Sequence, residues 1–307
     1  TLFPYTTLFR STSFSLSGCA TALVTPFTPD GALDEAALTS LVDWQVAEGI
    51  HGLVPCGSTG EAATLSLAER RRVVRLTVET VAGRVPVIAG AGGNDTRVAI
   101  ETSKAMAAEG ATHLLHVSPM YSKPPQRGIL AHFRAIADAS PLPIVVYNVP
   151  GRTGSNIEAE TTLALAEHAN IVAVKEASGN LAQITQIIRH APAGFRTLSG
   201  DDGLTLAVIA GGGHGLISVV SNAVPAAMSR LCNLASAGDL DEARAVHLRL
   251  HAFCQTAFCE SNPIPIKAAL AMMGRIGNHL RLPLVSMSTS HEPALRASLV
   301  EAGALSA

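Results

Sequence analysis

The 307-residue chain is predicted to fold as an α/β protein of the (β/α)8 barrel class, followed by a small C-terminal helical domain. Two observations predict this. A short apolar run, a loop rich in Gly, Pro, Ser or Asn, and an amphipathic stretch recur eight times, at roughly 20 to 35 residues per unit. After Ala223 only helical patterns follow. A doubly wound open sheet is the alternative, but no Gly-x-Gly-x-x-Gly motif opens the first helix.

The eight predicted strands are short apolar runs of the kind that parallel sheets bury on both faces. In a barrel, the carboxyl ends of these strands meet at one rim, which is where catalytic groups belong. The predicted strands cover residues 20–24, 52–55, 85–89, 112–117, 144–147, 171–175, 195–199 and 215–219.

The helices between the strands have recognisable ends. Ser66 and Glu69 form a capping box, and Gly83 ends the same helix, while the helix before it stops at Gly49. Further barrel helices are predicted at 94–109, 126–139, 158–168, 181–190 and 202–210, and the helices after Ala223 at 225–237, 240–259, 265–273 and 293–299. We therefore assign residues 14–237 to the barrel and 238–307 to the C-terminal helical domain.

Composition argues against several classes of partner. The net charge is −2, and charged residues make up 15% of the chain. Three consecutive arginines at 70–72 fall in a predicted helix, and we interpret them as its solvent-exposed face. We expect no nucleic-acid partner. The apolar run 204–220 is broken by glycines at 211–215, so no membrane span is expected. Five cysteines show neither metal-ligand spacing nor a disulfide framework, which indicates a reducing cytoplasm and no bound metal.

Residues 1–13 require separate treatment. They have no charged n-region and no small-residue cleavage site, so they do not form a convincing signal peptide. Residues 1–11 resemble the translation of a commonly used DNA sequencing adapter. We interpret residues 1–13 as foreign to the natural protein, expect them to be disordered or idle on the surface, and exclude them from the fold.

Lys175 is the first candidate for chemistry. It ends the apolar run 171–174, so a rigid strand would present it at the barrel rim. Burial there lowers the pKa of a lysine and favours the neutral amine, which can attack a carbonyl and form a Schiff base. The alternative is a lysine that only extends to solvent from a strand end.

Other reactive side chains follow neighbouring strands. The 57–61 loop carries the hydroxyls of Ser58 and Thr59 between glycines and suits a carboxylate or phosphate, although such residues are also ordinary turn formers. Tyr147 ends the fifth strand and could relay protons, and Arg152 follows it and could hold a carboxylate. Tyr121 lies in a proline-rich loop after the fourth strand, and the eighth strand supplies Ile217 and Ser218. Barrel geometry would bring the candidates after strands two, five and six together.

With these residues in view, the chain from about residue 17 onward resembles the dihydrodipicolinate synthases, a branch of the pyruvate-dependent class I aldolases in the N-acetylneuraminate lyase superfamily. Six motifs match in order across nearly the whole chain. They are Gly-Ser-Thr-Gly-Glu at 57–61, Tyr-Asn-Val-Pro-Gly-Arg-Thr-Gly at 147–154, Val-Lys-Glu-Ala-Ser-Gly-Asn at 174–180, Ser-Gly-Asp-Asp at 199–202, Gly-Gly-His-Gly-Leu-Ile-Ser at 212–218 and Asn-Pro-Ile-Pro at 262–265.

The resemblance implies roles for the catalytic residues. Lys175 would form the Schiff base with pyruvate. Tyr147 and Ser58 would form a proton relay, completed by Tyr121 from a neighbouring subunit. Ser58 stands where the synthases often carry threonine, a change that keeps the hydroxyl.

The resemblance also implies how substrates are bound. Thr59 and the backbone around it would hold the pyruvate carboxylate, Arg152 the carboxylate of L-aspartate 4-semialdehyde, and Ile217 would belong to the substrate-binding set. No metal or organic cofactor is implied. A homotetramer built as a dimer of dimers is implied, and the product would feed diaminopimelate and lysine biosynthesis.

Two other functions remain open at this point. One is an aldolase or hydratase-aldolase that acts on a 2-keto-3-deoxy sugar acid with the same Schiff-base chemistry. Arg152 favours the synthase, because the sialic acid lyases typically lack this arginine. The other is a barrel that only binds a phosphorylated ligand through residues 211–215.

We predict that L-lysine inhibits this protein weakly or not at all. The feedback site of some relatives usually includes a glutamate and a tyrosine at positions that match Val98 and Met120, and a histidine at the position of Arg70. Without the carboxylate and the phenol, the ammonium group of lysine would have few partners. A dose-response curve with strong inhibition at physiological lysine would contradict the prediction.

Overall fold

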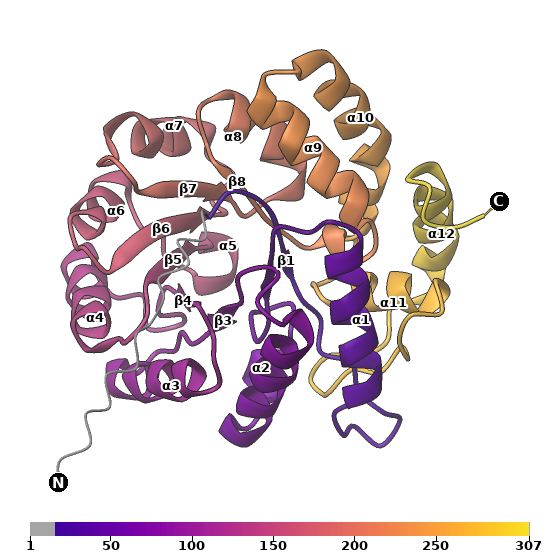
Figure 1. The fold of residues 1–307 in the computed structure, drawn as a ribbon, viewed down its shortest axis with the longest axis horizontal. Coiled ribbons are helices and arrows are strands. Elements are labelled where there is room, and N and C mark those ends of the chain that lie inside the picture. The colour runs from indigo at the N-terminus through magenta and orange to yellow at the C-terminus, as the bar shows by residue number, and fades with distance from the viewer. Residues whose placement is uncertain (1–15, 307) are drawn as a thin grey trace, which may run out of the picture.

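The computed structural model describes residues 16–306 and shows a barrel of eight parallel strands. Neighbouring strands pair in the order β2-β1-β8-β7-β6-β5-β4-β3, and a parallel bridge between Leu53 and Val87 joins the two ends of this series. The strands gather at the centre of Figure 1 with helices around them. They are β1 (Gly18–Ala22), β2 (Gly52–Val54), β3 (Ile88–Gly90), β4 (His113–Val117), β5 (Ile144–Asn148), β6 (Ile171–Glu176), β7 (Arg196–Ser199) and β8 (Gly215–Ser218).

The helices follow the amphipathic stretches of the sequence. The capping box of Ser66 and Glu69 is present at the start of α2. The helices are α1 (Glu35–Ala47), α2 (Leu67–Val81), α3 (Thr96–Ala108), α4 (Gln126–Ala139), α5 (Pro150–Thr153), α6 (Ala159–Ala166), α7 (Leu181–His190), α8 (Thr205–Ala210), α9 (Pro225–Ala237), α10 (Leu240–Thr256), α11 (Ile264–Met272) and α12 (Glu292–Glu301).

Two predicted strands are displaced along the chain. The first was placed at 20–24 and lies at Gly18–Ala22, because the Val24 amide donates to the side chain of Asn222 (3.1 Å) instead of continuing the ladder. The third was placed at 85–89 and lies at Ile88–Gly90. Pro86 can accept from Leu53 (3.0 Å) but has no N–H to donate, so the segment before Ile88 pairs only at an isolated bridge.

Two helical segments also differ from expectation. No helix was predicted between residues 148 and 157, but Pro150 opens the one-turn helix α5, where its fixed φ and missing N–H are tolerated. The helix predicted at 202–210 begins with a 3-10 turn over Asp202–Leu204 before α8. Arg152 lies in the first of these segments and Asp202 in the second.

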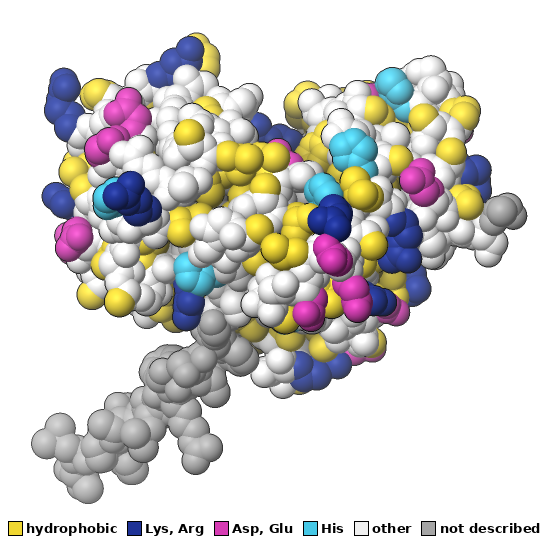
Figure 2. Space-filling view, turned by 90° about the horizontal axis from the view of Figure 1, so that it is seen from above, with side chains coloured by type: hydrophobic (Ala, Val, Ile, Leu, Met, Phe, Trp, Pro, Cys, Tyr) yellow, Lys and Arg dark blue, Asp and Glu magenta, His cyan; other side chains and the backbone are white. Residues whose placement is uncertain are grey.

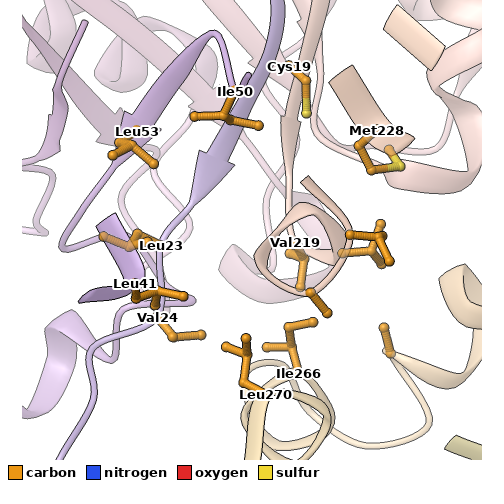
Figure 3. Packing of buried hydrophobic residues seen from close by; sticks show 14 of the residues in the cluster. Cys19, Leu23, Val24, Leu41, Ile50, Leu53, Val219, Met228, Ile266 and Leu270 are labelled. Carbon is orange, nitrogen blue, oxygen red and sulfur yellow. The ribbon is translucent and has the colours of Figure 1, made fainter. Parts of the chain in front are cut away.

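The C-terminal helices share the hydrophobic core of the barrel. Ile266 and Leu270 of α11 are fully buried, and Figure 3 shows them directed toward Val24 and Val219, which follow β1 and β8. The boundary that we proposed between residues 237 and 238 falls at the turn where Gly238 ends α9. Packing is continuous across that turn, because α10 lies against α9.

Several expectations concern the surface and the first residues. The interpretation of residues 1–13 as foreign falls outside the residues that the structure describes. Between residues 16 and 306, no helix combines the length and apolar character needed to cross a bilayer. On the face seen in Figure 2, basic, acidic and histidine side chains are interspersed over the described residues rather than gathered by sign.

Candidate active site

A cavity of about 360 Å³ opens at the carboxyl ends of the barrel strands. Its walls combine residues that are far apart in the sequence but that parallel strands bring to one rim. Among the lining residues are Ser58 and Thr59 after β2, Tyr147 of β5, Arg152 of α5, Lys175 of β6, Asp201 after β7 and Asn262 before α11. Five of the seven predicted site residues therefore meet in one place.

Lys175 lies at the base of this cavity with 4% of its surface exposed. It pairs with Tyr147 in the β5–β6 register, and its Nζ lies 4.3 Å from the centroid of the Tyr147 ring. Burial lowers the pKa of Lys175 to about 8, the nearby charge of Asp202 opposes this shift, and Arg152 adds to it. The neutral amine that a nucleophile requires is therefore a minor form near neutral pH, but a far more abundant one than for an exposed lysine.

Gly200 leaves room for the lysine side chain. A Cβ at this position would lie 2.6 Å from the Cβ of Ala177 and 3.1 Å from Cε of Lys175. Both approaches are closer than ordinary carbon contacts, so any larger residue would push the lysine from its place. The glycine of the 199–202 motif thus has a steric role beside the reactive amine.

Asp202 is a buried acid that sequence reasoning noted within a motif but gave no role. Its carboxylate accepts hydrogen bonds from Oγ of Ser218 (2.5 Å) and from the Val219 amide (3.0 Å). Burial raises the pKa of Asp202 to about 6 against the effect of these bonds. At a pH between the pKa of Asp202 (about 6) and that of Lys175 (about 8), the acid is ionised and the lysine is protonated. Each group then stabilises the charge of the other.

Tyr147 is 7% exposed, and burial raises its pKa to about 12, although the charge of Arg152 opposes the shift. The phenol therefore keeps its proton in the resting site. Ser58 is exposed and shares the cavity wall with Tyr147. Within residues 16–306 no hydrogen bond joins the two side chains, so a relay between them requires a bridging group.

The backbone of the 57–61 loop folds into a tight turn. Gly60 donates to the carbonyl of Gly57 (3.1 Å), and Glu61 donates to that of Ser58 (3.2 Å). Within the described part of the chain, the amides of Ser58 and Thr59 have no hydrogen-bond acceptor. Such free N–H groups at a cavity wall suit a carboxylate.

Asn262 connects two walls of the cavity. Its Nδ2 donates to Oγ1 of Thr59 (2.9 Å), and its backbone carbonyl accepts from Nη2 of Arg152 (3.1 Å). Asn262 precedes α11, so the C-terminal segment contributes directly to the site. The sequence contained the signal, because Asn262 opens one of the six matching motifs, but its contacts could not be read from that motif.

A buried ion pair holds the 57–61 loop against α11. Nζ of Lys267 lies 2.6 Å from Oε1 of Glu61, and neither side chain is exposed. Lys267 also donates to the carbonyl of Thr25 (2.9 Å), and the Arg281 amide donates to the second oxygen of Glu61 (3.1 Å). These contacts satisfy the two charges and fix the end of the loop that carries Ser58 and Thr59.

Two predicted site residues do not line the cavity. Ile217 is fully buried in the apolar cluster that fills the barrel interior. Tyr121 is 93% exposed on the outer surface and has a φ of 68°, a backbone conformation unusual for a tyrosine. This chain alone therefore does not bring Tyr121 to Lys175.

A second cavity of about 560 Å³ adjoins the first and shares Ser58, Tyr147 and Arg152 with it. Arg70 and Met120 line this cavity, whereas Val98 is exposed on α3. The guanidinium of Arg70 donates to the carbonyl of Ala62. Two of the three residues considered for lysine feedback thus meet at one cavity.

Comparison with known proteins identifies the family of the chain. The family model described as the dihydrodipicolinate synthetase family matches residues 15–302, which is nearly the whole chain. The chain belongs to the dihydrodipicolinate synthetase family. Its similarity to the family extends through all eight strands and the C-terminal helices.

Two curated members of the family are 4-hydroxy-tetrahydrodipicolinate synthases. The protein of Koribacter versatilis is 50% identical over 94% of this chain and 97% of its own length. That of Nitratidesulfovibrio vulgaris strain Miyazaki F is 49% identical over 93% of this chain and 98% of its own length. A similar solved structure is that of the chloride-inhibited dihydrodipicolinate synthase of Acinetobacter baumannii, complexed with pyruvate. It superposes with a TM-score of 0.93 at 40% sequence identity, and the match covers 94% of this chain and 99% of that one.

Breaking the pair of Lys267 and Glu61 should destabilise this family member strongly. We expect Lys267→Met to lower the free energy of unfolding by about 3–5 kcal/mol, because Glu61 would stay buried without its cation. Chemical denaturation measures the change. The double variant Lys267→Met/Glu61→Gln should recover part of the loss, since it removes the second charge as well.

Arg230→Met provides the matched control, because this arginine pairs with Glu242 on the surface, where both side chains are mostly exposed. It should change the unfolding free energy little. If Lys267→Met proves no more harmful than Arg230→Met, the buried pair does not hold the loop.

Proposed function

We propose that this protein is a lyase that condenses pyruvate with L-aspartate 4-semialdehyde through a Schiff base on Lys175, forming 4-hydroxy-tetrahydrodipicolinate for the diaminopimelate route to lysine. The observation that carries the proposal is the buried Lys175, with a pKa lowered to about 8, in one cavity with Tyr147 and Arg152. The names of the relatives and the pyruvate in the Acinetobacter structure support the same chemistry.

The proposed reaction begins with attack of the neutral Nζ of Lys175 on the keto carbon of pyruvate. The resulting carbinolamine loses its hydroxyl as water, and the iminium that remains withdraws electrons from the adjacent methyl group. Loss of a methyl proton gives an enamine, whose carbon attacks the aldehyde and forms the new carbon–carbon bond. The amino group of the second substrate then attacks the iminium carbon, closes the ring and releases Lys175.

Proton transfer in these steps is assigned to Tyr147 and Ser58. The phenol of Tyr147 is protonated in the resting site and close to Lys175, so it can donate to the departing hydroxyl and recover the proton later. A substrate hydroxyl or water would bridge Tyr147 to Ser58. Tyr121 is exposed, which leaves it free to reach the cavity of a second subunit.

Substrate binding is assigned to the 57–61 loop and Arg152, which line the same cavity. The free amides of Ser58 and Thr59, with the Thr59 hydroxyl, would bind the carboxylate of pyruvate. Arg152 would bind the carboxylate of the amino aldehyde, for which a guanidinium fork is well suited. Ile217 would act only through its backbone, because its side chain faces the barrel interior.

We further propose that the reaction belongs to the carbon–oxygen lyase class and needs no metal or organic cofactor, because the iminium itself serves as the electron sink. The assembly is proposed to be a homotetramer of two tight dimers in the cytoplasm. The exposed Tyr121 supports the dimer, since its role requires a neighbouring subunit.

An aldolase or hydratase-aldolase for 2-keto-3-deoxy sugar acids is the second candidate, because it would use the same lysine. Parallel assays with aspartate semialdehyde and keto-deoxy-gluconate separate the two functions. The binding of a phosphorylated ligand by residues 211–215 has less support. Residues 211–214 precede β8 and Gly215 begins it, at the amino ends of the strands and opposite the cavity.

Pyruvate should form an adduct on Lys175 that borohydride reduction traps, and the rate of trapping should rise with pH through about 8. Below that pH the amine is protonated and cannot attack, and above it the neutral form dominates. Peptide mass analysis after timed reduction gives the site and the rate. Lys175→Arg should form no adduct, whereas an adduct on another lysine in the folded protein would refute the assignment.

Arg152→Ala should weaken use of the amino aldehyde far more than it weakens pyruvate binding. We expect a loss of about 10- to 100-fold in kcat/KM for the aldehyde, the usual cost of one charge-assisted contact. The trapping assay on Lys175 should change by only a few-fold. Equal losses for both substrates would contradict the role of Arg152, and Arg152→Lys tests whether the charge alone is sufficient.

A further inference from the structure

We propose that Asn262 selects the amino aldehyde by accepting a hydrogen bond from its ammonium group at Oδ1. The inference rests on the proposed function, and it assigns a recognition role to a residue that the catalytic scheme does not use. It also explains how the site could distinguish this substrate from aldehydes that carry a carboxylate but no amino group.

The first observation is an unpartnered acceptor on a residue that lines the cavity. Asn262 is 6% exposed, and its Oδ1 has no hydrogen-bond partner among the described residues. The other side-chain atom, Nδ2, is committed to Thr59. A buried amide oxygen without a donor costs stability, so this oxygen is suited to a donor that a ligand supplies.

The second observation is the position of Asn262 relative to Arg152. An α-amino acid carries its carboxylate and its ammonium on the same carbon, so the two groups that recognise them must be neighbours. Nη2 of Arg152 donates to the backbone carbonyl of Asn262, and both residues line the same cavity. A carboxylate held by Arg152 would therefore lie next to Asn262, and in the proposal the attached ammonium turns toward Oδ1 of that residue.

The chemistry of the acceptor gives a further argument for an amide. A carboxylate beside the ammonium would raise the pKa of that group and keep its proton. A neutral amide oxygen binds the cation with a smaller effect on its pKa. This matters because the amine must lose a proton before it can attack the iminium and close the ring.

Asp201 is the competing acceptor in the cavity, because it also lines the wall and has a carboxylate side chain. One of its oxygens already accepts from the Gly203 amide (2.9 Å), where it caps the 3-10 turn that begins at Asp202. Asn262 lacks such a commitment at Oδ1 and touches Arg152, so it is the better placed of the two. Asp201→Asn is therefore the matched control.

The experiment compares aspartate semialdehyde with 4-oxobutanoate, which has the same carboxylate and aldehyde but no amino group. We expect Asn262→Ala to lower kcat/KM for aspartate semialdehyde about 10- to 100-fold. The inhibition constant of 4-oxobutanoate should change by less than about three-fold, since that ligand has no ammonium group to lose. If Asn262→Ala weakens the binding of both ligands equally, Asn262 acts only through Thr59 and Arg152. If Asp201→Asn is the variant that selectively lowers kcat/KM for aspartate semialdehyde, the ammonium group belongs to Asp201.

Asn262→Asp tests whether the side chain at position 262 acts on the substrate as a hydrogen-bond acceptor and not as a donor. It keeps oxygen atoms at the wall and adds a charge, so the KM for aspartate semialdehyde should be equal to or lower than that of the parent protein, while kcat should fall because the ammonium keeps its proton. A higher KM would overturn the proposal. The Thr59→Val background removes the other partner of the amide, and the selective effect of Asn262→Ala should persist there.

The trapping of pyruvate on Lys175 distinguishes the possible failures. If the parent protein traps pyruvate and uses aspartate semialdehyde while Asn262→Ala shows no selective loss, only the role of Asn262 fails. If the parent protein traps no pyruvate, the proposed function itself fails. Circular dichroism and the unfolding midpoint of each variant confirm that the compared proteins are folded.

Discussion

The burial of one amine determines how the rest of the site must be built. Lys175 ends β6 inside the barrel, where loss of water lowers its pKa to about 8 and makes the neutral nucleophile available. That position requires a glycine opposite the side chain, because Gly200 leaves the space it occupies. A nearby anion is also needed to stabilise the protonated form of Lys175 in the core, and Asp202 supplies this negative charge.

The C-terminal segment has a direct part in this arrangement. A parallel barrel aligns strand ends but does not fix the loops that follow them, and the 57–61 loop must hold two amides and two hydroxyls still. Lys267 and Asn262, on either side of the start of α11, hold that loop through Glu61 and Thr59. The helices after the barrel therefore stabilise one wall of the candidate site, and their apolar residues extend the hydrophobic core.

Much of the fold could be predicted from local patterns. Eight apolar runs between amphipathic stretches indicated the barrel, and the capping box of Ser66 and Glu69 placed the start of α2. Errors arose where tertiary contacts compete with local preference. The first strand ends early because Asn222, 198 residues away from Val24, takes the next amide. The third starts late because Pro86 cannot complete the ladder.

By itself, the sequence determined the barrel, the candidate lysine and the group of side chains at the strand ends, because periodicity and residue chemistry are local properties. Only the tertiary structure decided which of these residues share a cavity, that Ile217 faces the interior, and that Asn262 joins Thr59 to Arg152. It also revealed the buried charges of Asp202 and of the pair Lys267 and Glu61. Burial and pairing depend on contacts between distant segments, and a linear pattern of residue types does not contain them.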